Sequence, residues 1–310
     1  MKMPRLKVPR LRDIKSKLGA AKLLGLVVKN SLTFKIKRSA LRRFRHAEFD
    51  TIIVDMDGTL YKTDANLEAL ALAYPEKTES GKASGEEIYN SVISKIASGE
   101  YSIEKAIVEG NKFLMGRKIS RPHLFHVLDR IKPQLRRQLI NALIDIKASG
   151  KTIVLATLSS KDFGNMLNEH LKLKYGFEFD CIIGTELGFN EAGAITGIKS
   201  MVGTKDFEFE GIAVRTKLTA IKEGLAAQGK NFDVKKSVII TDSYADIDIA
   251  KMLVTILLRP SSPTTAQKIS YRLGLADYIL PDNKDLKVNL ESIILGAEKE
   301  EASEISKEEK

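Results

Sequence analysis

The sequence predicts an α/β fold built on a doubly wound parallel sheet, with a helical segment inserted after the first strand. Beyond residue 134, short apolar runs of strand character alternate with helical patterns, and this alternation is typical of a parallel sheet covered by helices. Residues 64–134 show helical patterns and no strand pattern, so we expect them to form a separate unit. A chain of 310 residues is long enough to bury a full core and a smaller accessory unit.

The first strand is expected immediately before a group of acidic residues. Thr51, Ile52, Ile53 and Val54 form a β-branched apolar run, as a strand buried on both faces requires. The run ends in Asp-Met-Asp-Gly, which has the composition of the loop after such a strand. We therefore expect the core to begin at residue 48.

The inserted segment is expected to contain several short amphipathic helices. Helical patterns cover residues 85–98 and 102–115. A third helix is predicted to begin at Ser120, with Pro122 near its first turn, where proline is tolerated.

After the insert, a helix over residues 134–148 closed by Gly150 leads back to the sheet. Further strands are predicted near residues 151–157, 180–184, 237–242, 253–258 and 277–280. Helices between them are predicted near residues 161–173, 216–228 and 245–252. Residues 186–198 predict a β-hairpin beside the sheet.

These patterns divide the chain into four parts. The core is predicted over residues 48–63 and 135–290, and the helical insert over residues 64–134. Residues 1–47 form a basic N-terminal extension, and residues 291–310 form a charged tail that we expect to be frayed.

The positive charge of the protein is concentrated in the N-terminal extension. Residues 1–47 hold fifteen Lys and Arg against one acid, Asp13, so they carry 15 − 1 = +14. The rest carries 50 − 15 = 35 basic against 40 − 1 = 39 acidic residues, or −4, which is ordinary for a globular protein. Three interpretations of the extension stay open: an amphipathic anchor on anionic lipid, a solvated tail, and, with less support, an arm that binds nucleic acid.

Neither a membrane span nor a secretory signal is predicted. The apolar run from Gly19 to Val28 is interrupted by Lys22 and is about half the ~20 residues needed to cross a bilayer. The single cysteine, Cys181, has no intramolecular disulfide partner and leaves no cysteine cluster for zinc. A reducing, cytoplasmic location fits this usage, with peripheral attachment to a membrane as an open alternative.

Polar side chains follow three of the predicted strands. Asp55 and Asp57 follow the first strand, Thr157 ends the strand near 151–157, and Asp242 ends the strand near 237–242. Because ligands of open α/β sheets collect at the carboxyl ends of the strands, we expect these side chains to converge. Clustered carboxylates need a compensating cation, and hard oxygen ligands favour Mg²⁺ as a cofactor.

The same residues carry a family resemblance. Asp-Met-Asp-Gly-Thr-Leu at residues 55–60 resembles the first motif of the haloacid dehalogenase superfamily, and Thr157 matches its second motif. Lys217 matches the third, and Thr-Asp-Ser-Tyr-Ala-Asp at residues 241–246 is similar to the fourth. The resemblance spans roughly residues 49–281 and implies a Rossmann-like core. The Gly-x-x-x-Gly pattern over 193–197 and the segment Arg-Pro-Ser-Ser-Pro over 259–263 are similar to the phosphoserine phosphatase-like branch.

The resemblance implies a role for each matching residue. Asp55 is the expected nucleophile that forms an aspartyl-phosphate, and Asp57 the expected acid and base. Thr157 and Lys217 are expected to act at the phosphate, where Lys217 neutralises charge. Gly58 and Ser159 are also expected to contact the substrate.

For the metal, the resemblance implies that Asp55, Asp57, Asp242 and Asp246 hold Mg²⁺, with Asp57 acting through its backbone carbonyl. Asp248 is an alternative to Asp246.

The sequence leaves more than one interpretation open for several of these residues. Lys205 and Lys222 compete with Lys217, and Thr157 also suits a purely structural role in a strand. Asp64 suits either a contact with a substrate amino group or the cap of the next helix. Thr241 stands where the family usually has glycine.

The insert resembles the movable cap that chooses the substrate in this superfamily. It holds a basic stretch that either meets an acidic substrate or faces solvent: Arg117, Lys118, Arg121, His123 and His126.

The resulting prediction is a Mg²⁺-dependent phosphomonoester hydrolase acting on a small phosphorylated metabolite or a lipid head group. Two alternatives are a phosphotransferase on the same fold and a membrane- or nucleic-acid-binding protein with an idle phosphatase site. Neither the substrate nor the oligomeric state follows from the sequence.

Overall fold

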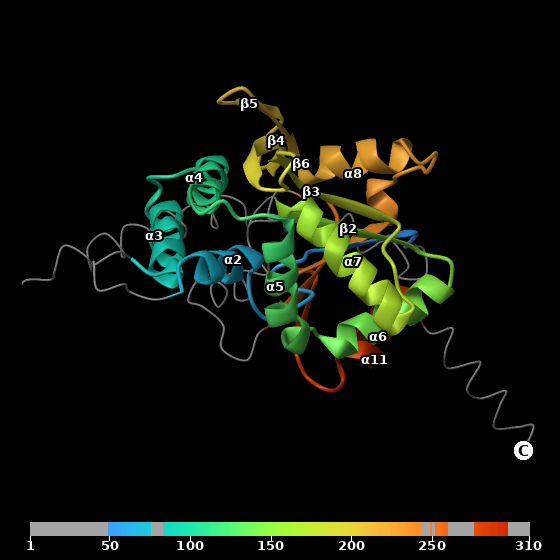
Figure 1. The fold of residues 1–310 in the computed structure, drawn as a ribbon. Helices are drawn as coiled ribbons and strands as arrows, with labels where there is room; N and C mark the ends of the chain where they lie inside the picture. Colours follow the sequence, from blue (N-terminus) through green and yellow to red (C-terminus); the bar gives the residue numbers. More distant parts are fainter. Residues whose placement is uncertain (1–48, 76–82, 243–248, 250–251, 260–275, 297–310) are drawn as a thin grey trace, which may run out of the picture.

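A computed structural model describes residues 49–75, 83–242, 249, 252–259 and 276–296 (Figure 1). Within them, nine strands form one sheet in the order β5-β6-β4-β3-β2-β1-β7-β8-β9. The strands are β1 (Thr51–Val54), β2 (Thr152–Ser160), β3 (Cys181–Phe189), β4 (Ile195–Gly203), β5 (Phe207–Phe209), β6 (Ile212–Thr216), β7 (Ser237–Thr241), β8 (Val254–Arg259) and β9 (Tyr278–Pro281). Six neighbouring strands of this sheet are parallel to one another: β3, β2, β1, β7, β8 and β9.

Helices cover both faces of the parallel strands because successive side chains point to opposite sides. In β1, Ile52 and Val54 belong to the apolar cluster under α6 (Arg137–Ala148), α7 (Lys161–Tyr175) and α11 (Leu286–Leu295). Ile53 belongs to the cluster under α8 (Lys217–Ala226) on the other face. Figure 1 shows α8 on one side of the strands and α6 and α7 on the other. The predicted doubly wound α/β fold is confirmed.

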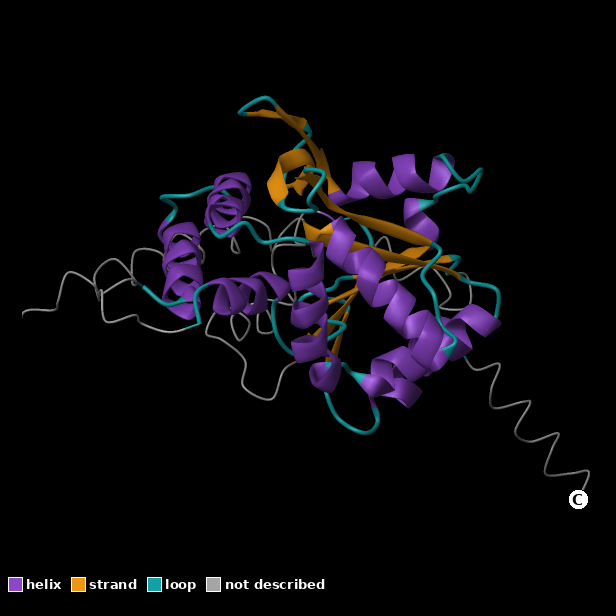
Figure 2. Cartoon of the chain, in the orientation of Figure 1, coloured by secondary structure: helices purple, strands orange, loops and turns teal. Residues whose placement is uncertain are grey.

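Between β1 and α6, the described residues are mostly helical, as Figure 2 shows. This segment contains α2 (Ala65–Ala73), α3 (Gly85–Ser98), α4 (Ile103–Gly116) and α5 (Arg121–Ile131), followed by a short 3₁₀ turn over Lys132–Gln134. A capping box between Ser84 and Glu87 begins α3, and Gly99 ends it in the left-handed region at φ 73°. We call residues 64–134 the helical insert.

The helical insert is attached to the β3–β4 hairpin. The backbone amide of Ile195 donates to the carbonyl of Ile119 over 2.8 Å, and Arg121 donates to Gly193 over 3.1 Å. On α4, the buried carboxylate of Glu104 accepts the Thr204 amide and hydroxyl at 2.8 and 2.7 Å. The predicted hairpin therefore supports the insert.

The strands β5 and β6 and the helix α11 were not anticipated by the sequence patterns. The short strands β5 and β6 are joined by Glu210 and Gly211, both with positive φ, as two-residue hairpin turns require. Helix α11 crosses the boundary predicted at residue 291, because Leu290 and Ile294 are fully buried in the core.

Other predictions fall on residues that the structure does not describe. These are the N-terminal extension, most of the helix near 245–252, and the tail beyond residue 296. Among the described residues, no helix is both long and apolar enough to cross a membrane.

Candidate active site

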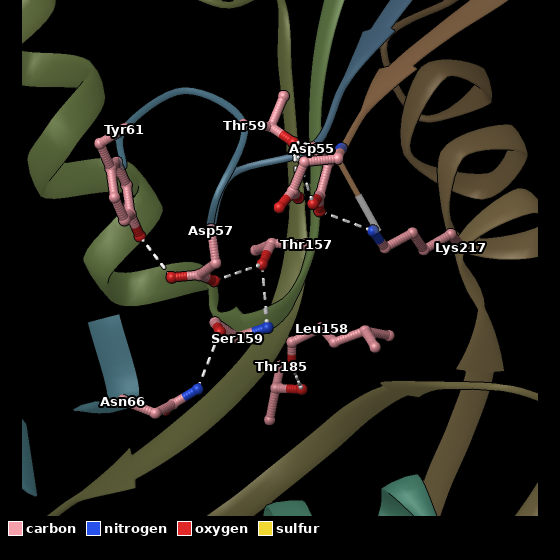
Figure 3. Close-up of polar contacts among 11 residues, drawn as sticks. Asp55, Asp57, Thr59, Tyr61, Asn66, Thr157, Leu158, Ser159, Thr185 and Lys217 are labelled. Carbon is pink, nitrogen blue, oxygen red and sulfur yellow. Dashed lines mark hydrogen bonds and ion pairs between the residues drawn. The ribbon is translucent and has the colours of Figure 1, made fainter. Parts of the chain in front are cut away.

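Asp55 lies at the end of β1 and faces the first residue of α8. Its side chain is 8% exposed, and its Oδ1 lies 2.7 Å from Nζ of Lys217, which is 6% exposed. Thr216 caps α8 by accepting from the Thr219 amide, and this cap fixes where the helix begins. The helix start thus aims a buried ammonium group at Asp55, as Figure 3 shows. Lys205 and Lys222 are exposed.

Asp57 sits in the loop after β1, and its carboxylate is turned toward the helical insert. The hydroxyl of Tyr61 and the amide of Ala65 both donate to its Oδ1 at 2.6 Å, and Thr157 donates to Oδ2 at 3.3 Å (Figure 3). Burial, followed by the negative charge of Asp57, raises the pKa of Tyr61, so this hydroxyl stays a donor at neutral pH. Three donors therefore fix the orientation of the Asp57 carboxylate.

Asp242 follows β7 and meets the same loop. The fully buried hydroxyl of Thr59 accepts from the Asp242 amide at 2.9 Å and lies 3.1 Å from Asp242 Oδ1 and 3.5 Å from Asp55 Oδ2. Gly58 has φ +70°, and a Cβ there would lie 2.3 Å from Asp242 Oδ2. The glycine therefore allows both the turn and the close approach of the carboxylate.

Thr157 and Ser159 lie near the carboxyl end of β2, beside the Asp57 carboxylate. The Thr157 hydroxyl accepts from the Ser159 amide at 3.0 Å, and the Ser159 hydroxyl accepts from Asn66 of α2 at 2.9 Å. Both side chains are buried. The Ser159–Asn66 contact connects the core to the helical insert (Figure 3).

Arg136 is a site residue that the sequence reasoning missed. Its guanidinium is 4% exposed, and its Nη1 donates to the backbone carbonyls of Gly58, Thr59 and Tyr61, the latter two at 2.9 and 3.0 Å. Its Nε lies 3.1 Å from Oδ2 of Asp282. Arg136 thus holds the loop that carries Asp57, although it lies some eighty residues away in sequence and matches no motif.

We expect Arg136→Met to lower kcat about 100-fold with little change in KM, because the loop loses its fixed position while the phosphate contacts remain. Steady-state kinetics with a phosphomonoester measure both parameters. The matched control is Arg137→Met, since Arg137 is exposed at the start of α6. Activity of the Arg136 variant within twofold of the wild type would show that the loop does not depend on this residue.

The residues present fit a divalent cation. Asp55 and Asp242 place carboxylate oxygens around one hydroxyl, that of Thr59, and hard oxygen donors of this kind suit Mg²⁺. Within the described ranges, no cluster of three His, Cys, Asp or Glu side chains forms a complete metal site. The fourth predicted ligand, Asp246, lies outside the described residues, as does Asp248.

One cavity of about 630 Å³ collects these side chains. It is lined by seven of the predicted site residues: Asp55, Asp57, Gly58, Thr157, Ser159, Lys217 and Asp242. The side chains of the basic stretch of the insert are exposed, and none of them lines the cavity: Arg117, Lys118, Arg121, His123 and His126.

Asp64 borders the cavity and serves as a helix cap. Its Oδ1 accepts the amides of Asn66 and Leu67, and its Oδ2 accepts the Tyr89 hydroxyl at 2.8 Å. Burial, reinforced by the charge of Asp57, raises the pKa of Asp64 to about 7. Of the two interpretations of Asp64, its hydrogen bonds support the cap.

Comparisons with known proteins define the class of this site. The family model of the haloacid dehalogenase-like hydrolases matches residues 52–251. The fold is similar to that of a HAD family hydrolase from Salmonella enterica serovar Typhi, with 15% identity, TM-score 0.55, and 81% of this chain and 72% of that chain covered. No curated protein sequence matches the chain.

Two further structures connect the fold to phosphoserine phosphatases. A phosphoserine phosphohydrolase-like protein from Francisella tularensis shares 15% identity over 78% of this chain and 99% of its own, with TM-score 0.53. A phosphoserine phosphatase solved as an analogue of its phospho-aspartyl intermediate shares 15% identity over 78% of this chain and 98% of its own, with TM-score 0.52.

The chain belongs to the haloacid dehalogenase-like hydrolases. The predicted family is thereby confirmed, and the fold is similar to that of phosphoserine phosphatases.

Proposed function

We propose that the protein is a Mg²⁺-dependent phosphomonoester hydrolase that works through an aspartyl-phosphate on Asp55. The observation that carries the proposal is the buried Asp55 carboxylate, held 2.7 Å from the Lys217 ammonium at one end of a ligand-sized cavity. An idle binding site has no need of a carboxylate buried against an ammonium group, because burying charged groups is costly.

In the first step, an Asp55 oxygen attacks phosphorus and the bond from phosphorus to the leaving oxygen breaks. The carboxyl group of Asp57 gives its proton to that oxygen, which leaves as an alcohol. In the second step, Asp57 takes a proton from water, whose oxygen attacks the aspartyl-phosphate and releases inorganic phosphate. Asp55 is then a carboxylate again, and Asp57 has regained the proton.

The remaining side chains stabilise charge and exclude water. Lys217 neutralises the charge that gathers between the carboxylate and the phosphate, and the Thr157 hydroxyl donates to a phosphate oxygen. The helical insert lines the cavity opposite these groups, and a substrate that displaces water there would strengthen these electrostatic interactions.

Mg²⁺ fits this scheme as a charge-neutralising ion for the phosphate oxygens. Asp55, Asp242 and the backbone carbonyl of Asp57 would hold it, with Asp246 as a further ligand.

We expect phosphate release from p-nitrophenyl phosphate to stop when EDTA removes divalent cations and to return when Mg²⁺ is added in excess, because two adjacent carboxylates and a phosphate repel one another without a cation. A colorimetric phosphate assay measures the effect. Turnover that persists in EDTA would contradict the metal requirement, and no turnover across a broad panel of monoesters would overturn the proposed hydrolase function. The same assay with added alcohols separates the alternatives, since a phosphotransferase yields a new phosphomonoester.

A further inference from the structure

The cavity has two chemically different ends. The catalytic carboxylates and Lys217 line one end, and apolar side chains from all four helices of the insert line the other. Examples from α2 to α5 are Leu70, Val92, Ile96, Ile103, Ile107 and Leu124. Figure 1 shows α2 and α3 extending away from the sheet, with α4 between α3 and β4, so the apolar end leads out of the catalytic centre into the insert.

Helical spacing produces this apolar wall. Val92 and Ile96 lie one turn apart on α3, and Ile103 and Ile107 lie one turn apart on α4. All four are only half-buried while they line the cavity. Packing within the protein therefore leaves part of their apolar surface accessible. A ligand that covers this surface is bound more tightly through the hydrophobic effect.

The polar side chains of the insert that border the cavity are already bonded within the protein. Asp64 and Tyr89 bond each other, Asn66 donates to Ser159, and the amide group of Asn111 donates to the Ile107 carbonyl at 2.9 Å. A polar leaving group would have to compete with these bonds.

Cationic groups in the lining are also engaged. Among the described residues, Lys62 and Lys217 are the lysines that line the cavity, and no arginine lines it. Lys217 pairs with Asp55, and Lys62 lies 3.1 Å from Asp282. The described part of the wall therefore offers no cation for a second acidic group on the substrate.

We propose that the substrate is the phosphomonoester of an apolar alcohol, whose hydrocarbon chain lies between α3 and α4 while its phosphate lies at Asp55. This inference rests on the proposed function and adds the substrate class.

Gly110 has no side chain, and this leaves space in the cavity for part of the substrate's hydrocarbon chain. Gly110 lines the cavity from α4, and a Cβ built there meets no atom within 4 Å. The cavity volume of about 630 Å³ lies within the ~300–1,000 Å³ typical of ligand pockets.

The test is a series of n-alkyl monophosphates from ethyl to dodecyl, assayed below their micelle concentrations with O-phosphoserine as the polar comparison. We expect kcat/KM to rise about fourfold per methylene, which corresponds to about 0.8 kcal/mol, until the cavity is full. O-phosphoserine should be turned over more slowly than butyl phosphate. Rates independent of chain length, or a preference for O-phosphoserine, would overturn the inference while leaving the hydrolase intact.

A matched pair of variants tests where the hydrocarbon chain of the substrate binds. Gly110→Leu should end the rise at a shorter alkyl chain, so that its loss of kcat/KM relative to the wild type grows with chain length. Gly116→Leu, on the same helix but outside the cavity lining, should follow the wild type. Identical chain-length profiles for the two variants would refute the proposed location.

A binding measurement separates this inference from the proposed function. If no monoester is hydrolysed, the hydrolase proposal fails, and calorimetry with n-alkyl phosphonates still tests the apolar wall. Affinity that increases with chain length supports recognition of an apolar chain, and equal affinity across the series overturns it.

Discussion

Replacement of Asp55 by asparagine should lower kcat at least about 1,000-fold, because an amide is no nucleophile toward phosphorus. The asparagine oxygen can still accept a hydrogen bond from Lys217, whose Nζ lies 2.7 Å from Oδ1 in the wild type. The variant should therefore remain folded, with circular dichroism like that of the wild type. Steady-state phosphate release measures the loss.

The covalent intermediate gives a second readout for the same variant. Acid quenching of the wild type during turnover should yield protein heavier by one phosphoryl group in intact mass spectra, and Asp55→Asn should yield none. The matched control is Asp50→Asn, because Asp50 is exposed at the other end of β1 and its pair with Lys236 is a surface contact. A phosphoryl adduct that survives in the Asp55 variant would place the nucleophile elsewhere.

The sequence allowed the sheet to be predicted because its strands carry strong local signals. β1 and β7 are continuous apolar runs, and each is followed directly by an acidic residue, Asp55 or Asp242. The fold then brings these strand ends together, since β1 pairs with both β2 and β7. Proximity of the motif residues follows from that topology alone, whereas their catalytic roles still need kinetic tests.

Contacts between segments that are distant in the sequence could not be predicted, because no local sequence pattern indicates them. Arg136 reaches the catalytic loop through backbone carbonyls, and carbonyls are present at every residue. The hydroxyl of Thr59 belongs to a known motif, yet its position between two carboxylates depends on the loop conformation set by Gly58. The strands β5 and β6 were missed because Glu-Gly is a weaker hairpin signal than Asn-Gly.

The helical insert shows how charge in a sequence can mislead about a substrate. The basic residues stand close together in the sequence, which suggests a site for an acidic substrate. In the structure, however, their side chains are exposed. The helix faces that line the cavity are mainly apolar. Which face of a helix meets the cavity depends on tertiary packing, here on the attachment of α4 to β4 through Glu104 and Thr204.

The effect of Asp57→Asn should depend on the leaving group, which makes it the sharpest test of the proposed mechanism. An asparagine cannot supply a proton, so alkyl phosphates should lose about 100- to 10,000-fold in kcat. p-Nitrophenolate leaves without protonation, so the first step with p-nitrophenyl phosphate should stay fast. Because the second step needs Asp57 as a base, the aspartyl-phosphate should accumulate.

Rapid-mixing experiments with p-nitrophenyl phosphate detect this accumulation as a burst of one p-nitrophenolate per enzyme, followed by slow turnover. Tyr61, Ala65 and Thr157 hold the Asp57 carboxylate in place beside the cavity that Asp55 also lines. Asp50→Asn again serves as the control and should match the wild type with both classes of substrate. Equal losses for alkyl and nitrophenyl esters, without a burst, would show that Asp57 orients the loop and transfers no proton.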